Sequence, residues 1–455
     1  MAQRSSLEYT PLPERAQKIV EAFIPSEEQI EREIAQYAHV KPRAPDKDLD
    51  TEVLDGVVFT HHFVLGPGDA EVIQWHYVEA GPGPTPNAYS TTKDHANDDN
   101  DDDNDDDSHY KNTEAEAEAE VETIVFLHGI PDAWYQWHHQ MSHLSKPRTG
   151  AGRGYRCIAV DLKGYGQSDK APGDYRHEGA GEQLFDMLQL ILAPDNNTTN
   201  NNNTHTNTSH GNTNTNTNDN ERKVVKRKRF NLVTHDRGTV QADFIVANHP
   251  DSIIRYMRGE QHLYHFNPLL APQGDIFKDA PWTGIMDDPI RFVVWVHNFV
   301  RGKKPLRPTE MERVIQEFSY PGISRAVPRY FNSSSFRIEW LQRRQRLLKA
   351  WKCPVLIMQG YDSKSQPREF YENARDYIPN AERVAVQYIP GGHFWTLESP
   401  KETTDAIERF MKDSVNARCV TGKSCCRYMF FWDAAPGESE YTRRLHEIVR
   451  GIVAR

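Results

Sequence analysis

Apolar and polar residues alternate in short segments along this chain, and their spacing predicts which segments are helices and which are strands. Between residues 13 and 40 the apolar positions recur at helical spacing, which predicts an N-terminal helical arm within 1–50. The period then changes to that of strands in 57–64 and 71–78, which are separated by a Gly-Pro-Gly sequence. These two segments predict an antiparallel hairpin.

Short apolar segments and amphipathic helices alternate through much of the remaining chain. The expected helices are 179–192, 239–249 and 402–411, and the expected strands are 123–127, 157–160, 230–234, 253–257, 354–358 and 383–389. With the hairpin, this makes eight strands. Buried strands that alternate with helices are typical of a mostly parallel sheet with helices on both faces. The predicted fold class is therefore α/β.

One long segment interrupts this alternation. Residues 262–350 are rich in helical and aromatic patterns and show no strand alternation. Ligands of such sheets bind at the carboxyl ends of the strands, so we expect this segment to form a helical cap over those ends. The core then comprises 51–261 and 351–413, and a divergent tail follows at 414–455.

Composition modifies this picture at two polar insertions. Only 37% of the 455 residues are apolar, which is low for a compact enzyme. Two regions, about 94–120 and about 195–222, account for part of this dilution because they contain runs with almost no apolar residue. Such segments cannot bury enough apolar surface to offset the cost of ordering, so we expect them to be disordered. The net charge of −11 comes substantially from the acidic run and indicates little about partners.

Several partner and cofactor classes find no support in the sequence. The N-terminus lacks an apolar leader, no apolar run reaches 18 residues, and the five cysteines are unevenly spaced. These features predict a cytoplasmic protein without a membrane segment. The basic run 226–229 abuts a predicted strand, so we interpret it as a solvated strand entry and expect no nucleic-acid partner. Cys419, Cys425 and Cys426 lack a second ligand pair, so neither a metal nor another cofactor is expected. The oligomeric state is not indicated.

The segment 230–238 carries the most specific chemical signal. Its apolar run Phe230 to Thr234 leads into His235-Asp236-Arg237-Gly238 and then into helical sequence. A strand, a sharp turn and a helix form a nucleophile elbow, in which the nucleophile sits at the tip of the turn. The usual residue there is serine, but here it is Asp236. A carboxylate nucleophile favours attack at saturated carbon over ordinary ester hydrolysis.

An acid and a histidine follow the elbow in the order nucleophile, acid, histidine. Asp362 and His393 each come just after a predicted strand. Glu260 ends the strand that follows the elbow helix and is the alternative acid. We favour Asp362 over Glu260 as the partner that fixes the tautomer of His393.

These motifs resemble those of the epoxide hydrolase and dehalogenase branch of the α/β-hydrolase family. The resemblance rests on His128 to Trp137, Asp161 to Asp169, the elbow and Gly392-His393-Phe394, and it covers about 51–195 and 229–412 without the insertions. It implies an α/β-hydrolase fold, an aspartyl alkyl-ester intermediate formed by Asp236, and water as the second reactant.

The resemblance also implies roles for further residues. The backbone N–H groups of Ile130 and Arg237 would form the oxyanion hole, and the cap residue Tyr330 would polarise an epoxide oxygen. The tryptophans after His128 and the residues where a first cap tyrosine is expected suggest substrate-binding positions at Trp134, Trp295 and His297. The substrate would be a small electrophilic molecule.

Three functions remain open at this point. Epoxide opening to a diol is the first, although no tyrosine occurs in 289–297. A haloacid or haloalkane dehalogenase is the second, because Arg237 matches the Asp-Arg pair of fluoroacetate-type enzymes while Val240 stands where their second arginine is expected. The third is a catalytically inactive α/β-hydrolase fold that serves as an interaction protein.

Overall fold

The computed structural model of the chain describes residues 9–14, 26–68, 72–82, 121–147, 153–193, 227–271 and 273–416. Both predicted insertions, about 94–120 and about 195–222, lie outside these residues, and so does most of the predicted tail. Of the predicted N-terminal arm, the described part contains α2 (Glu27–Tyr37).

A nine-stranded sheet forms the centre of the molecule, in the order β1-β2-β3-β5-β4-β6-β7-β8-β9. The strands are β1 (Thr51–Leu54), β2 (Val57–Gly66), β3 (Ile73–Ala80), β4 (Thr123–Leu127), β5 (Arg156–Val160), β6 (Phe230–His235), β7 (Ile253–Gly259), β8 (Val355–Gly360) and β9 (Val384–Ile389). From β5 to β9 neighbouring strands pair in parallel, whereas β1, β2, β3 and β5 pair antiparallel.

The sheet has one strand more than the eight predicted. The additional strand, β1, is a four-residue edge strand that pairs through its backbone with β2. Its residues alternate between exposed and half-buried positions, so it lacks the continuous apolar run that identifies a buried strand.

Helices cover both faces of the sheet, as predicted. On one face, α4 (His177–Leu192) and α5 (Asp236–Asn248) pack against each other, and on the other face α3 (His138–Leu144) packs against α15 (Pro400–Asn416). Alternate residues of β4 enter different cores: Val125 packs in the cluster of α4 and α5, and Phe126 in that of α3 and α15. Because both faces of the strands are buried, their sequences are continuously apolar.

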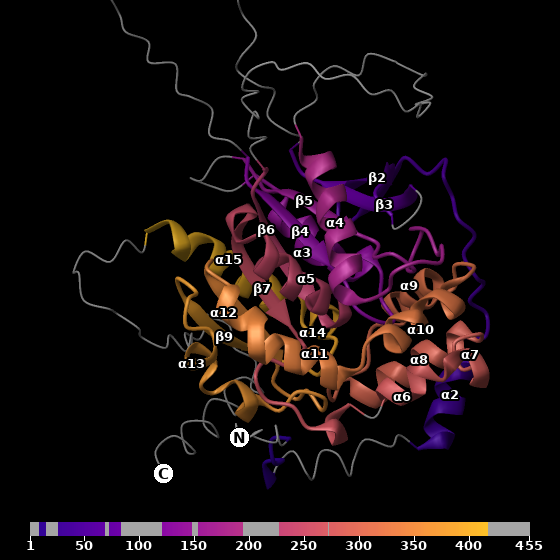
Figure 1. Cartoon of the computed structure of the whole chain (residues 1–455). Coiled ribbons are helices and arrows are strands. Elements are labelled where there is room, and N and C mark those ends of the chain that lie inside the picture. The colour runs from indigo at the N-terminus through magenta and orange to yellow at the C-terminus, as the bar shows by residue number, and fades with distance from the viewer. Residues whose placement is uncertain are drawn as a thin grey trace, which may run out of the picture.

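The helical segment 262–350 lies between β7 and β8 in the chain and contains no strand among its described residues. Its helices are α6 (Gln273–Lys278), α7 (Ala280–Thr283), α8 (Pro289–Val300), α9 (Pro308–Phe318), α10 (Ile323–Ser333), α11 (Phe336–Gln342) and α12 (Leu348–Ala350). In Figure 1, α6 to α10 gather beside one end of the sheet, together with α2. The arm is attached to this segment, since Gln29 donates a hydrogen bond of 3.0 Å to Asn298 of α8.

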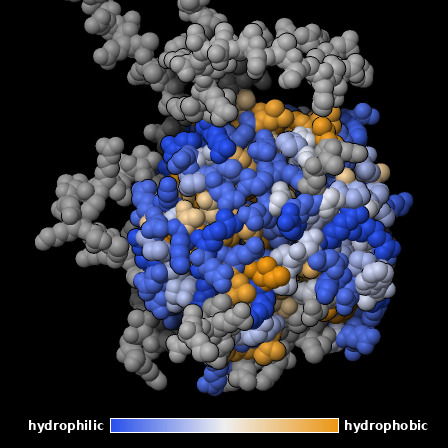
Figure 2. All heavy atoms as spheres, in the orientation of Figure 1, coloured by the Kyte–Doolittle hydropathy of each residue, from blue (hydrophilic) through white to orange (hydrophobic). Residues whose placement is uncertain are grey.

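The face that Figure 2 shows is mainly hydrophilic, with small, separate hydrophobic areas. Within the described ranges, no helix combines the length and the hydropathy that crossing a bilayer demands. The shorter elements that complete the core are the 3₁₀ turn η1 (Trp134–Trp137) and the helices α13 (Ala374–Tyr377) and α14 (Trp395–Glu398).

Candidate active site

The predicted elbow is present at the junction of β6 and α5. Asp236 has a φ of +46°, a left-handed conformation that non-glycine residues rarely adopt. The turn is tight on both sides. A Cβ at Gly129 would lie 2.4 Å from the Cβ of Asp236, and one at Gly238 would lie 2.4 Å from the carbonyl oxygen of His128. Glycine at both positions therefore allows the strained turn that presents the Asp236 carboxylate.

Two donors hold the carboxylate of Asp236. The backbone N–H of Ile130 donates to Oδ1 over 3.0 Å, and Nε2 of Gln261 lies 3.4 Å from Oδ2. Arg237 lies in the first turn of α5, where backbone N–H groups have no partner within the helix. Oδ1 thus accepts from Ile130, one of the two residues predicted to form an oxyanion hole, and Oδ2 is the oxygen on the side of His393.

His393 lies between Asp236 and a buried acid. Its Nε2 is 3.7 Å from Oδ2 of Asp236, and its Nδ1 is 3.0 Å from Oε2 of Glu260. The preference for Asp362 as the acid is therefore corrected, because the alternative, Glu260, occupies that position. Asp362 is part of the loop after β8, where its backbone N–H donates to the carbonyl oxygen of Gly391 over 2.8 Å.

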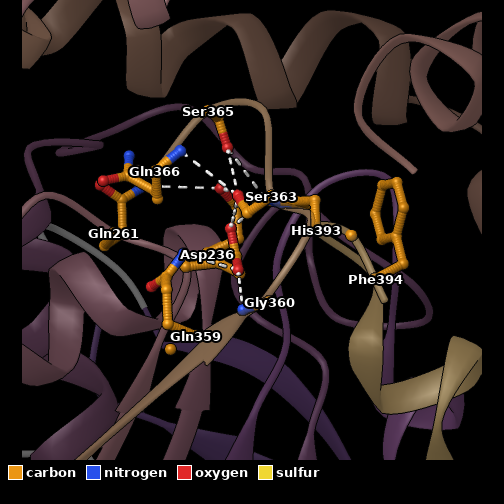
Figure 3. A network of polar contacts seen from close by, with 12 residues as sticks. Asp236, Gln261, Gln359, Gly360, Ser363, Ser365, Gln366, His393 and Phe394 are labelled. Carbon is orange, nitrogen blue, oxygen red and sulfur yellow. Dashed lines mark hydrogen bonds and ion pairs between the residues drawn. The ribbon is translucent and has the colours of Figure 1, made fainter. Parts of the chain in front are cut away.

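The carboxylate of Glu260 is fixed by donors from β8 and the loop that follows it. Oε1 accepts hydrogen bonds of 2.7 Å from Gln359 and from the backbone N–H of Gly360, and Oε2 accepts one of 2.8 Å from Ser363. Figure 3 shows this network, with Ser363, Ser365 and His393 directed toward one another. Glu260 itself has a φ of +51° directly after β7, so its side chain turns toward the neighbouring strand β8.

The electrostatics of the site favour a protonated His393 when Asp236 is charged. Burial lowers the pKa of His393, but its hydrogen bond to Glu260 and the charges of Glu260 and Asp236 raise it to a net value above the usual 6.5. His235 has the opposite environment: burial and the neighbouring His393 hold its pKa well below 6.5. Neutral His235 donates through Nε2 to the carbonyl oxygen of His393 over 2.7 Å and so helps to position it.

The side chain of Arg237 points away from these groups and pairs with the helical segment 262–350. Its guanidinium donates to both oxygens of Glu339 in α11, over 2.6 and 3.2 Å, and it lies over the rings of Phe331 and Phe336. It also contacts Nε2 of His177. Arg237 and Glu339 are both fully buried. This pair connects the elbow to α11 and leaves the guanidinium already matched with a carboxylate.

Two tyrosines lie together beside the elbow. The hydroxyl of Tyr330 donates to the carbonyl oxygen of Lys163 over 2.8 Å and accepts from Gln241 over 3.2 Å. Its ring centroid is 6.1 Å from that of Tyr165 in the loop after β5. The buried hydroxyl of Tyr165 has no hydrogen-bond partner among the described residues. Burial, and next the charge of Asp236, raise the pKa of Tyr165, so this hydroxyl lies within electrostatic range of Asp236.

The three predicted substrate-binding side chains lie in different places. Trp134 is in the core on the α3 face, with its ring 5.7 Å from Phe59. Trp295 packs on Phe299 within α8 at 5.4 Å. His297 stacks on Phe394 at 3.9 Å, directly beside His393.

Two groups at the site have no role predicted from the sequence. One is Tyr165, and the other is Asp132, whose buried carboxyl oxygens have no hydrogen-bond partner among the described residues. The pKa of Asp132 is raised to about 8, mainly by burial; the charge of His393 opposes this shift and that of Asp236 adds to it. Asp132 lies in the motif His128 to Trp137, and Tyr165 lies in the motif Asp161 to Asp169. Membership of these motifs is the sequence signal that could have identified both residues. Burial without a polar partner becomes visible only in the folded chain.

The comparisons with known proteins agree with this architecture. The family described as "alpha/beta hydrolase fold" matches residues 122–257. Epoxide hydrolase 1 of Siraitia grosvenorii is 47% identical over 50 residues, which are 11% of this chain and 14% of that protein. Epoxide hydrolase 3 of Mus musculus is 22% identical over 312 residues, covering 64% of this chain and 70% of that protein.

Among solved structures, a Bacillus megaterium epoxide hydrolase in complex with an inhibitor superposes with a TM-score of 0.51 at 16% identity, covering 77% of this chain and 100% of that one. The chain matches the first curated relatives over only about one seventh of their length. It has the α/β-hydrolase fold, and over part of its length it is similar to epoxide hydrolases.

Proposed function

We propose that this protein hydrolyses an epoxide to a diol through an ester between the substrate and Asp236. One observation carries the proposal: a carboxylate, in place of a hydroxyl, sits at the tip of the elbow, with Ile130 N–H on one oxygen and His393 facing the other. Such an arrangement suits displacement at a saturated carbon followed by hydrolysis of the resulting ester.

In the first step Oδ2 of Asp236 attacks one epoxide carbon. The carbon–oxygen bond breaks, and its electron pair goes to the epoxide oxygen, which takes a proton from a tyrosine hydroxyl. Tyr330 was the expected donor, and its hydroxyl proton is directed to the carbonyl oxygen of Lys163. Tyr165 supports the same step from a neighbouring position, with a hydroxyl that has no partner among the described residues. Tyr165 would therefore serve as the second tyrosine beside Tyr330, a position for which 289–297 contains no tyrosine.

In the second step water attacks the carbonyl carbon of the ester, and Nε2 of His393 takes its proton. The ester carbonyl is Oδ1, whose developing charge is met by the N–H groups of Ile130 and Arg237. Collapse of the tetrahedral intermediate releases the diol and regenerates the Asp236 carboxylate. Glu260 stabilises the imidazolium through Nδ1, and His393 returns its proton to the tyrosinate through solvent.

The helical segment 262–350 acts in this proposal as the cap. It contributes Tyr330 and, through the Arg237–Glu339 pair, fixes α11 against the elbow. The same pair argues against the dehalogenase alternative that uses Arg237 to bind a substrate carboxylate, because that guanidinium already has a buried carboxylate partner. Release of halide from organohalides is the direct test of that alternative.

The decisive experiment is a single turnover in ¹⁸O-labelled water, with the full chain and a panel of epoxides such as styrene oxide. Attack of water on the ester places one heavy oxygen in Asp236, which mass spectrometry of the peptide detects. His393→Gln should retain the ester as a mass increase equal to that of the substrate. If neither label nor product is detected with any of the epoxides and organohalides, both hydrolytic functions are contradicted. The remaining function is then that of a catalytically inactive interaction protein. Halide without diol would favour the dehalogenase.

A further inference from the structure

A cluster of histidine and carboxylate side chains lies outside the active site, where three separate elements meet. His138 and His139 begin α3, Glu310 lies in the first turn of α9, and Asp55 is in the turn between β1 and β2. One ligand atom from each of Asp55, His138 and His139 lies within 4.8 Å of the others. The proposed reaction uses none of these residues.

Hydrogen bonds orient both imidazole rings of the cluster. Nδ1 of His138 lies 2.8 Å from the carbonyl oxygen of Tyr135, which can only accept, so Nδ1 carries the proton and Nε2 offers a lone pair. Nδ1 of His139 lies 2.8 Å from Oδ2 of Asp55. Metal-binding histidines in proteins show this pattern, in which the second ring nitrogen donates to a carbonyl or a carboxylate.

Both Nε2 atoms face the same carboxylate. They lie 3.8 Å (His138) and 3.0 Å (His139) from Oε1 of Glu310. Two ligands of a tetrahedral zinc ion, with bonds of about 2.0–2.1 Å, lie about 3.3–3.4 Å apart, so the observed separations are on either side of that value. Glu310 is 3% exposed, and its Oε2 has no hydrogen-bond partner among the described residues. Each of the two contacts with Oε1 is thus close to the separation of two ligands that share one ion.

A cationic nitrogen already occupies this position. The guanidinium of Arg307 lies 2.8 Å from Nε2 of His139 and also contacts Oε1 of Glu310. The side chain of Arg307 is 64% exposed, whereas that of Glu310 is 4% exposed. A long, exposed side chain can withdraw into solvent at little cost, and the buried acceptors would then need another cation.

We propose that His138, His139 and Glu310 bind a divalent transition-metal ion of the zinc class, which displaces the guanidinium of Arg307. Two imidazoles and a carboxylate form a ligand set that zinc accepts, with water as the fourth ligand. The ion would fasten α9 of the helical segment 262–350 to α3 of the core, and Asp55 would orient His139 from outside the coordination sphere. Adjacent histidines and a distant glutamate do not form a recognisable spacing, so the sequence predicted no metal.

The test is calorimetric titration of the EDTA-treated full chain with ZnCl₂. We expect saturable binding of one ion. Asp55→Asn should weaken it by about 10- to 100-fold, as removal of an outer partner does, and His139→Gln or Glu310→Gln should weaken it further. Arg307→Ala should tighten it, because the competing cation is removed. His143→Gln is the matched control: it lies on the same helix, and its exposed ring is 3.6 Å from Glu408.

A second readout separates lost binding from lost folding. Thermal unfolding is measured for His139→Gln and for the unsubstituted chain, each in EDTA and in zinc. Added zinc should raise the midpoint of the unsubstituted chain above its own value in EDTA and leave that of His139→Gln unchanged. Cobalt(II) in place of zinc should give the absorption of a four-coordinate ion. If Arg307→Ala shows no saturable binding, or if His143→Gln weakens binding as much as His139→Gln does, the proposal is wrong. These measurements do not depend on catalysis, so they stand apart from the proposed function.

Discussion

Replacing Glu260 by glutamine tests the corrected assignment of the acid. The substitution keeps the shape of the side chain but removes the charge that lies 3.0 Å from Nδ1 of His393. The new amide would also present two hydrogens to a position where Gln359, Gly360 and Ser363 already donate to the carboxylate. The imidazolium that forms when water is deprotonated would lose its buried counter-charge, and the tautomer of His393 would no longer be fixed.

In Glu260→Gln we expect hydrolysis of the ester to slow, whereas its formation keeps nearly the normal rate. Loss of the carboxylate partner of a catalytic histidine lowers kcat by about 10⁴-fold in a well-studied triad, which corresponds to about 5 kcal/mol at 1.36 kcal/mol per tenfold. Glu260 is fully buried, and Ser363 and Ser365 leave some polar support beside Nδ1, so we expect a loss of about 10³- to 10⁴-fold.

The assay is rapid mixing with an epoxide that the unsubstituted chain turns over, followed by acid quenching and mass spectrometry of the protein. Glu260→Gln should form the Asp236 ester at nearly normal rate and then accumulate it. Asp362→Asn is the matched control and should retain turnover within a few-fold. If Asp362→Asn accumulates the ester and Glu260→Gln does not, the reasoning from the Nδ1 contact is refuted.

Three further expectations follow from the same site. Glu339→Gln leaves the buried guanidinium of Arg237 without its counter-charge and should lower the free energy of unfolding in urea by about 3–5 kcal/mol. The control is Glu178→Gln, which removes an exposed ion pair with Arg346 and should lower that free energy by less than about 1 kcal/mol. Equal losses for the two variants would contradict the expectation. Tyr165→Phe should slow formation of the ester by about 10- to 100-fold and by more than Tyr330→Phe does, because the Tyr330 proton is already donated to a backbone carbonyl; the reverse order would assign the proton to Tyr330. The pKa of His393 is raised above 6.5 in the free protein, so its charge contributes fully to stability below pH 6.5 and this contribution is lost as pH rises through the folded pKa; hydrolysis of the ester should increase with pH, with a midpoint below that of the free protein because the ester removes the Asp236 charge. NMR titration of the His393 ring and the pH dependence of single turnovers measure the two midpoints.

The sequence by itself determined most of the secondary structure of the core and the position of Asp236 at the tip of the elbow. Buried parallel strands produce continuous apolar runs, and the elbow requires small residues beside Asp236, so both features are recorded in consecutive residues. The order Asp236 before His393 also follows from the chain alone. The edge strand β1 was missed because pairing through the backbone leaves little trace in side-chain pattern.

Only the tertiary structure decided which groups meet. Glu260 and Asp362 follow the neighbouring strands β7 and β8, and sequence cannot tell which carboxylate turns toward His393. The left-handed backbone of Glu260 and the donors of β8 settle it. Arg237 pairs with Glu339, and the ring of Tyr165 lies near that of Tyr330, although more than a hundred residues of chain separate the partners. Such pairs depend on how helices pack over the strand ends, and packing is a property of the folded chain as a whole.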